Sequence, residues 1–112
     1  DENEYILLLT LKAGEYTGSR VSDVDLFRIR NAMPHLAETL KKSLRPGDAV
    51  AQFSDSQYVI LLSACTYEGG MLAANRIISK FYQDHKVYRN LKIKIHIEKV
   101  KTAEHILNKY SG

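Results

Sequence analysis

The sequence of 112 residues has one cysteine, two prolines and no long apolar run. A single cysteine, Cys65, excludes a disulfide within the chain and any metal site built from several cysteines, which is typical of a reducing cytoplasm. No apolar run approaches the roughly 20 residues that cross a bilayer, and no signal-peptide pattern opens the sequence. We therefore expect a cytoplasmic protein with no membrane partner.

The composition is that of one folded domain, with 45% hydrophobic and 26% charged residues and no low-complexity tract. The net charge of +3 raises the question of nucleic-acid binding, which requires basic residues clustered on one surface. Much of the positive charge lies near the C-terminus, in Lys86, Arg89, Lys92, Lys94, Lys99, Lys101 and Lys109. These residues are spaced like the solvated face of a strand and its flanks, so we expect no direct nucleic-acid contact.

The first half of the sequence predicts a strand and a long helix. Residues 5–11 form a continuous apolar run, which suits the middle of a sheet that helices cover on both faces. A loop over 12–21 follows, and Ser22 or Asp23 can then cap a helix. Pro34 lies inside this helix, and we expect it to kink or break the helix there. The buried stripe expected from spacings of three and four is Leu26, Ile29, Met33, Leu36, Ala37, Leu40 and Leu44.

The second half predicts a hairpin, a helix, a strand and a short helix. Residues 49–53 and 57–62 are hairpin strands joined by three polar residues, 54–56. A helix follows over 67–83, unless Gly69 and Gly70 weaken its first turn and delay its start to Met71. Residues 91–98 alternate strictly as a strand does, and residues 102–110 close as a short helix. The inward residues expected in the longer helix are Leu72, Ala73, Ile77, Ile78 and Phe81.

The predicted order is β-α-β-β-α-β with a short C-terminal helix. This is an α/β arrangement (an α+β sandwich) of the ferredoxin-like or nucleotide-cyclase-like class. Fold alone does not give function.

Residues 36–62 resemble, without a gap over 27 residues, the core of the bacterial GGDEF (diguanylate cyclase) domain. In that family a helix of this pattern leads into an Arg-x-x-Asp turn, a strand, the signature hairpin and an apolar strand. The chain is therefore identified as a degenerate GGDEF-like domain over 1–112, and we expect it to be part of a longer regulator. The hairpin further resembles a branch found in bacterial transcriptional regulators that carry a bacterial transcriptional activator domain.

The hairpin and the first strand depart from the family in the residues that carry its chemistry. The family signature is Gly-Gly-Asp/Glu-Glu-Phe, and an aspartate that ligates magnesium ends the first strand. Here Thr10 takes the aspartate's place, and Lys12 would repel a cation. We therefore expect no cyclase activity, no metal site and no cofactor. The signature positions hold Ser54, Asp55, Ser56, Gln57 and Tyr58.

Arg45 and Asp48 keep the family's Arg-x-x-Asp pattern, five residues before the hairpin. In the family this pattern forms an inhibitory site for cyclic di-GMP: arginine can bind a phosphate or a guanine edge, and aspartate can accept from guanine N–H groups. A full site also needs a second arginine, which the sequence does not locate. The alternative is a structural turn in which Asp48 bonds to local backbone. Ser54, Asp55 and Ser56 have the same two interpretations, a binding contact or a simple turn.

Three functions remain as hypotheses. The first is a non-catalytic regulatory or interaction domain of a bacterial signalling or transcription regulator, with an attached effector domain or a second copy as partner. The second is a cyclic di-GMP receptor acting through Arg45 and Asp48. The third is a residual nucleotide cyclase.

Overall fold

The computed structural model describes residues 2–13 and 22–101. The predicted loop over 12–21 and the predicted helix over 102–110 therefore lie largely or wholly outside the described residues. The elements, in chain order, are β1 (Asn3–Lys12), α1 (Asp23–Ser43), β2 (Ala49–Ser54), β3 (Gln57–Cys65), α2 (Tyr67–Asp84), the 3-10 turn η1 (Lys86–Tyr88) and β4 (Lys92–Lys99).

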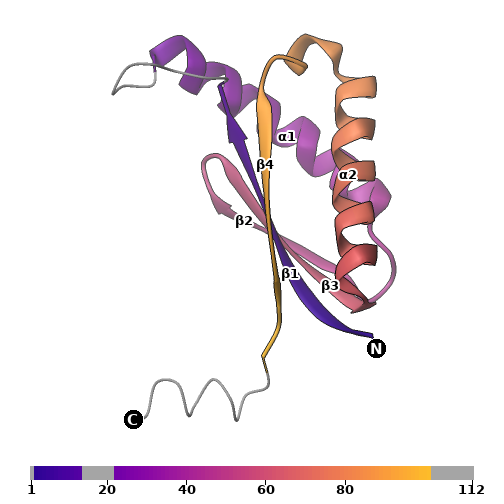
Figure 1. Cartoon of the computed structure of the whole chain (residues 1–112). Helices are drawn as coiled ribbons and strands as arrows, with labels where there is room; N and C mark the ends of the chain where they lie inside the picture. The colour runs from indigo at the N-terminus through magenta and orange to yellow at the C-terminus, as the bar shows by residue number, and fades with distance from the viewer. Residues whose placement is uncertain (1, 14–21, 102–112) are drawn as a thin grey trace, which may run out of the picture.

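The four strands form one antiparallel sheet in the order β2-β3-β1-β4 (Figure 1). Because β1 and β2 both run antiparallel to β3, they are parallel to each other with β3 between them. In the same way β3 and β4 are parallel with β1 between them. Each helix therefore connects two parallel strands that are separated by a third, which confirms the predicted α+β class and the βαββαβ order.

Helix α1 runs without a break through Pro34, so of the expected kink or break, the break is wrong. Pro34 lies on the exposed side of the helix, where water can reach the carbonyl oxygen that has lost its N–H partner. Ser22 caps the helix, as one alternative predicted: its Oγ accepts from the N–H of Asp25 at 3.1 Å. Most of the predicted stripe is buried or partly buried, but Leu26 is 47% exposed.

The core lies between the two helices and one face of the sheet. Alternate residues of β1 point into it: Tyr5, Leu7, Leu9 and Leu11 are buried, whereas the residues between them are partly or fully exposed. The expected cover on both faces is therefore wrong for the described residues, because α1 and α2 pack on the same side. We call the other side the open face; its apolar residues are Ile6, Leu8, Ala49, Ala51, Val59 and Leu61.

Helix α2 begins at Tyr67, not at Met71, because Thr66 caps it by accepting from the N–H of Gly69 at 3.0 Å. Gly70 packs closely on β4: a Cβ there would lie 2.5 Å from the terminal methyl carbon of Ile97, and that side chain would have to move. The predicted inward residue Leu72 is 69% exposed. The buried residues of α2 are Gly70, Ala74, Ile77 and Phe81, spaced by four, three and four.

Strand β4 shows the predicted alternation, with its isoleucines partly buried and its lysines exposed. The hairpin is tighter than predicted, since only Asp55 and Ser56 separate β2 from β3. None of the helices in the described part of the chain is long and apolar enough to cross a membrane.

Candidate functional site

The hairpin positions at which the resemblance places the GGDEF signature are linked to β1 by neutral hydrogen bonds. Gln57 lies opposite Thr10 in the sheet, and its Nε2 donates to the Thr10 Oγ1 at 3.1 Å. The Ser54 hydroxyl donates to the Gln57 Oε1 at 2.8 Å, while Asp55 is exposed in the turn. An amide and a hydroxyl thus occupy and connect the two places where the resemblance implies metal-binding carboxylates.

Tyr58, the last signature position, has a structural contact. Its ring is buried in the core, and its hydroxyl donates to the backbone carbonyl of Met33 at 2.9 Å, one residue before Pro34. Burial raises the pKa of the Tyr58 hydroxyl above its ordinary value. This side chain therefore ties the hairpin to the middle of α1.

A pocket of about 430 Å³ lies beside the hairpin. Lys12 and Arg30 contribute two cations to its lining and Asp55 contributes one carboxylate, with apolar side chains from β1 and α1 between them. Among residues 2–13 and 22–101, no group of three or more His, Cys, Asp or Glu side chains could hold a metal ion. The pocket's chemistry is therefore that of a cationic and apolar surface.

Arg45, Pro46, Gly47 and Asp48 form a tight turn between α1 and β2. The N–H of Asp48 donates to the carbonyl of Arg45 at 3.0 Å, and Gly47 has φ of +94°. Proline and then glycine with positive φ is the sequence preference of a type II turn. A side chain at Gly47 would also approach the Ser63 hydroxyl, at 2.9 Å from a Cβ.

The Asp48 carboxylate accepts hydrogen bonds from this turn and from β3. It accepts from the backbone N–H of Arg45 at 2.9 Å, and from the N–H and hydroxyl of Ser63 at 3.0 and 3.3 Å. Its side chain is only 2% exposed. Burial alone would raise the pKa of Asp48, but these hydrogen bonds and the charge of Arg45 outweigh burial, so the pKa lies below its ordinary value. These contacts therefore support the interpretation of Asp48 as a structural residue of the turn.

Arg45 is held by the same contacts but stays accessible. Its Nη2 donates to the Ser63 carbonyl at 2.7 Å, and its Nε lies 3.6 Å from the Asp48 Oδ2. The side chain remains 56% exposed. Because a guanidinium has five N–H donors, Arg45 keeps donors available for a ligand while its orientation is fixed.

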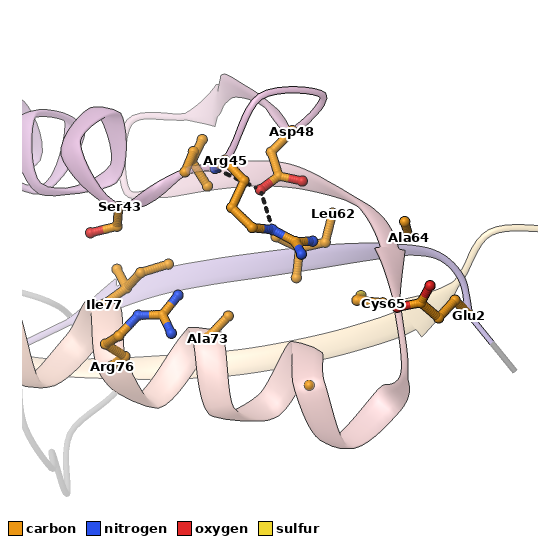
Figure 2. Close-up of a pocket in the computed structure, with 12 residues that line it drawn as sticks. Glu2, Ser43, Arg45, Asp48, Leu62, Ala64, Cys65, Ala73, Arg76 and Ile77 are labelled. Carbon is orange, nitrogen blue, oxygen red and sulfur yellow. Dashed lines mark hydrogen bonds and ion pairs between the residues drawn. The ribbon is translucent and has the colours of Figure 1, made fainter.

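Arg45 lines a pocket of about 250 Å³ together with Arg76, which comes from the middle of α2 (Figure 2). Both guanidinium groups point into the same space (Figure 2), whose floor is apolar at Leu62, Ala73 and Ile77. Within the described part of the chain, Arg76 makes no hydrogen bond or ion pair. Glu2 and Ser43 add acceptors and a hydroxyl at the rim.

Arg76 is a second arginine at this pocket, and the sequence did not locate it. Its place on α2, directly before the buried Ile77 and one turn after Ala73, puts it at the margin of the helix face that packs inward. In the sequence, the signal for Arg76 is its place at the edge of the apolar face of this helix. It could be used only once the packing of α2 beside the Arg45 turn was known.

Comparison of the chain with protein-family models and with curated protein sequences finds no match. We therefore infer function from the geometry of the hairpin and of the Arg45 pocket and from the resemblance of residues 36–62.

Proposed function

We propose that this chain is a non-catalytic regulatory domain that binds a phosphate-bearing guanine nucleotide, cyclic di-GMP in particular, in the pocket between Arg45 and Arg76. The observation on which the proposal depends is that these two arginines, from separate elements, line one pocket with an apolar floor. Arg45 supplies a pre-oriented guanidinium, and Arg76 supplies one that has no partner among the described residues.

The chemistry of the pocket matches such a ligand. Guanidinium groups bind phosphate oxygens or the acceptor edge of guanine through paired N–H donors. The apolar floor formed by Leu62, Ala73 and Ile77 suits the face of a base. The carboxylate of Glu2 at the rim can accept from the N–H groups of guanine. Asp48 has a different role from the one the resemblance implies: it positions Arg45 and leaves ligand contact to others.

The size of the pocket limits how much of the ligand it can enclose. A volume of about 250 Å³ lies below the range of about 300–1,000 Å³ typical of pockets that enclose a drug-sized ligand. The pocket therefore suits one phosphate and one base, and the rest of a dinucleotide would lie outside it. Half of the ligand would then remain available to another part of a larger regulator.

A non-catalytic role is supported by the hairpin. The neutral Gln57–Thr10 hydrogen bond replaces the carboxylate pair implied by the resemblance, and hard cations such as Mg²⁺ prefer carboxylate oxygens. Lys12 and Arg30 beside it repel a cation. Incubation with GTP and magnesium should yield no dinucleotide product above a blank without protein, and any product above the blank would contradict this part of the proposal.

The finer fold class and the biological setting belong to the same proposal. The two β-α-β units, each split by an inserted strand, support a ferredoxin-like, nucleotide-cyclase-like fold. We infer from the resemblance a cytoplasmic domain of a bacterial signalling or transcription regulator, coupled to an attached effector domain.

Titration calorimetry with cyclic di-GMP tests the ligand. We expect binding by the wild type and at least about tenfold weaker binding by Arg76→Ala, since the loss of a charge-assisted hydrogen bond costs about 1.5–3 kcal/mol. Arg89→Ala is the matched control, because Arg89 is also exposed but does not line the pocket. Wild-type affinity in both Arg45→Ala and Arg76→Ala, or no binding by the wild type, would refute the proposed site.

A further inference from the structure

The two edges of the sheet differ in how they are protected against pairing with another chain. An edge strand presents unpaired N–H and C=O groups, and proteins commonly guard such edges with charged side chains, lysine above all. The edge strand β4 has three lysines, at Lys92, Lys94 and Lys99. The other edge, β2, has the sequence Ala-Val-Ala-Gln-Phe-Ser with no charge, and five of its six residues are exposed.

We propose that β2 is a homodimer interface, in which the β2 strands of two copies pair antiparallel about a two-fold axis at Ala51. No described strand pairs with the free side of β2. A second copy fits this edge because an uncharged strand meets itself without like-charge repulsion, and an antiparallel pair of identical strands has two-fold symmetry. The result is one continuous eight-stranded sheet.

The register follows from the alternation of side chains along β2. Residues directly opposite each other in neighbouring strands lie on the same face of the sheet. One residue of β2 must therefore lie opposite its own copy, with the two-fold axis between the two copies. An axis at Ala51 pairs positions 49–53 with themselves. It places the two Ala51 residues opposite each other on the open face, and it places Phe53 of each copy, which lies at a bulge in the β2–β3 pairing, next to Ala49 of the other.

The shapes on the open face are self-complementary in this register. Phe53 is 66% exposed at this edge of the sheet. A shallow apolar groove of about 290 Å³ lies beside Ala49, over Ile6 and Leu61. In the proposed pair, the Phe53 ring of one copy covers Ala49 of the other and enters this groove. Two equivalent aromatic contacts then flank the central pair of alanines.

The association should be weak and should depend on salt. Six residues of strand span only about 20 Å, so the contact lies at the small end of specific interfaces. Each copy also has a net charge of +3, which opposes association at a distance. Added salt screens this repulsion and should strengthen the dimer.

Sedimentation velocity of the full chain over a concentration series tests the proposal. We expect the mean mass of the wild type to rise from 12.7 kDa toward twice that value. Ala51→Lys and Ala51→Glu should each stay monomeric, because two like charges meet on the axis, and an equimolar mixture of the two should associate again. A wild type that stays monomeric at every concentration, or a mixture that does not associate, would overturn the proposal.

Two further variants keep the test independent of folding effects. Phe53→Ser adds no charge and should weaken association at least about tenfold, or about 1.4 kcal/mol, through loss of the ring contacts. His96→Lys places a charge at the exposed middle of β4, and it should leave association unchanged. Loss of association in His96→Lys, or full association in Phe53→Ser, would assign the interface to a different surface.

Discussion

Replacing Asp48 by alanine should destabilise the domain strongly, although Asp48 lies in a turn. The substitution removes the acceptor of three hydrogen bonds, from the N–H of Arg45 and from the N–H and hydroxyl of Ser63. A hydrogen bond to a charged group contributes about 1.5–3 kcal/mol, and water entering beside the exposed Arg45 can replace part of it, so we expect a loss of about 2–4 kcal/mol. This is a large fraction of the about 5–15 kcal/mol that stabilises a typical domain.

Urea denaturation at neutral pH measures this loss, and its pH dependence checks the cause. Because the folded pKa of Asp48 lies below its ordinary value of 3.8, its contribution is complete above that value and is lost as pH falls through the folded pKa. The stability difference between wild type and Asp48→Asn should therefore shrink as the pH falls below 3.8 toward the lower pKa of the folded state. A loss below about 0.5 kcal/mol for Asp48→Ala would refute a structural role, since that is the range of neutral surface substitutions. A difference that does not change with pH would refute the charge argument.

The other predictions concern the hairpin and the turn. Tyr58→Phe should lower the free energy of unfolding by about 1 kcal/mol, because the hydroxyl that donates to Met33 is lost, and Tyr67→Phe at an exposed tyrosine should have no effect. Equal stabilities of these two variants in thermal denaturation would show that the Met33 contact contributes nothing. Gly47→Ala should cost about 1–3 kcal/mol, because φ of +94° and the nearby Ser63 hydroxyl both disfavour a Cβ. An alanine variant as stable as the wild type would show that the turn can adopt another backbone conformation.

Local patterns in the sequence were sufficient for the element order and for most of the core. The spacing of apolar residues located α1, and strict alternation located β4, since both patterns depend only on the period of one element. The predicted cap at Ser22 is equally local. The start of α2 at Tyr67 was predicted, and the alternative start at Met71, inferred from the low helix propensity of Gly69 and Gly70, was wrong because Thr66 caps the helix.

Features that depend on how elements pack could not be predicted from the sequence. The apolar run in β1 suggested cover on both faces, yet Ile6 and Leu8 lie on the open face beside β3 and β4. Pro34 suggested a break in α1, but its effect depends on which side of the helix meets water.

The candidate site was predicted in part for the same reason. Arg45 and Asp48 were identified through the resemblance to the family's Arg-x-x-Asp pattern. The use of Asp48 within the turn depends on Ser63, and the second arginine of the pocket depends on how α2 packs beside that turn.

The most direct test of the account is an NMR titration of the ¹⁵N-labelled chain with cyclic di-GMP. We expect chemical-shift changes concentrated at the residues around the pocket: Ser43, Arg45, Gly69, Ala73 and Arg76. Changes concentrated at the hairpin residues 54–58, or no changes at saturating nucleotide, would contradict the assignment of this pocket as the binding site.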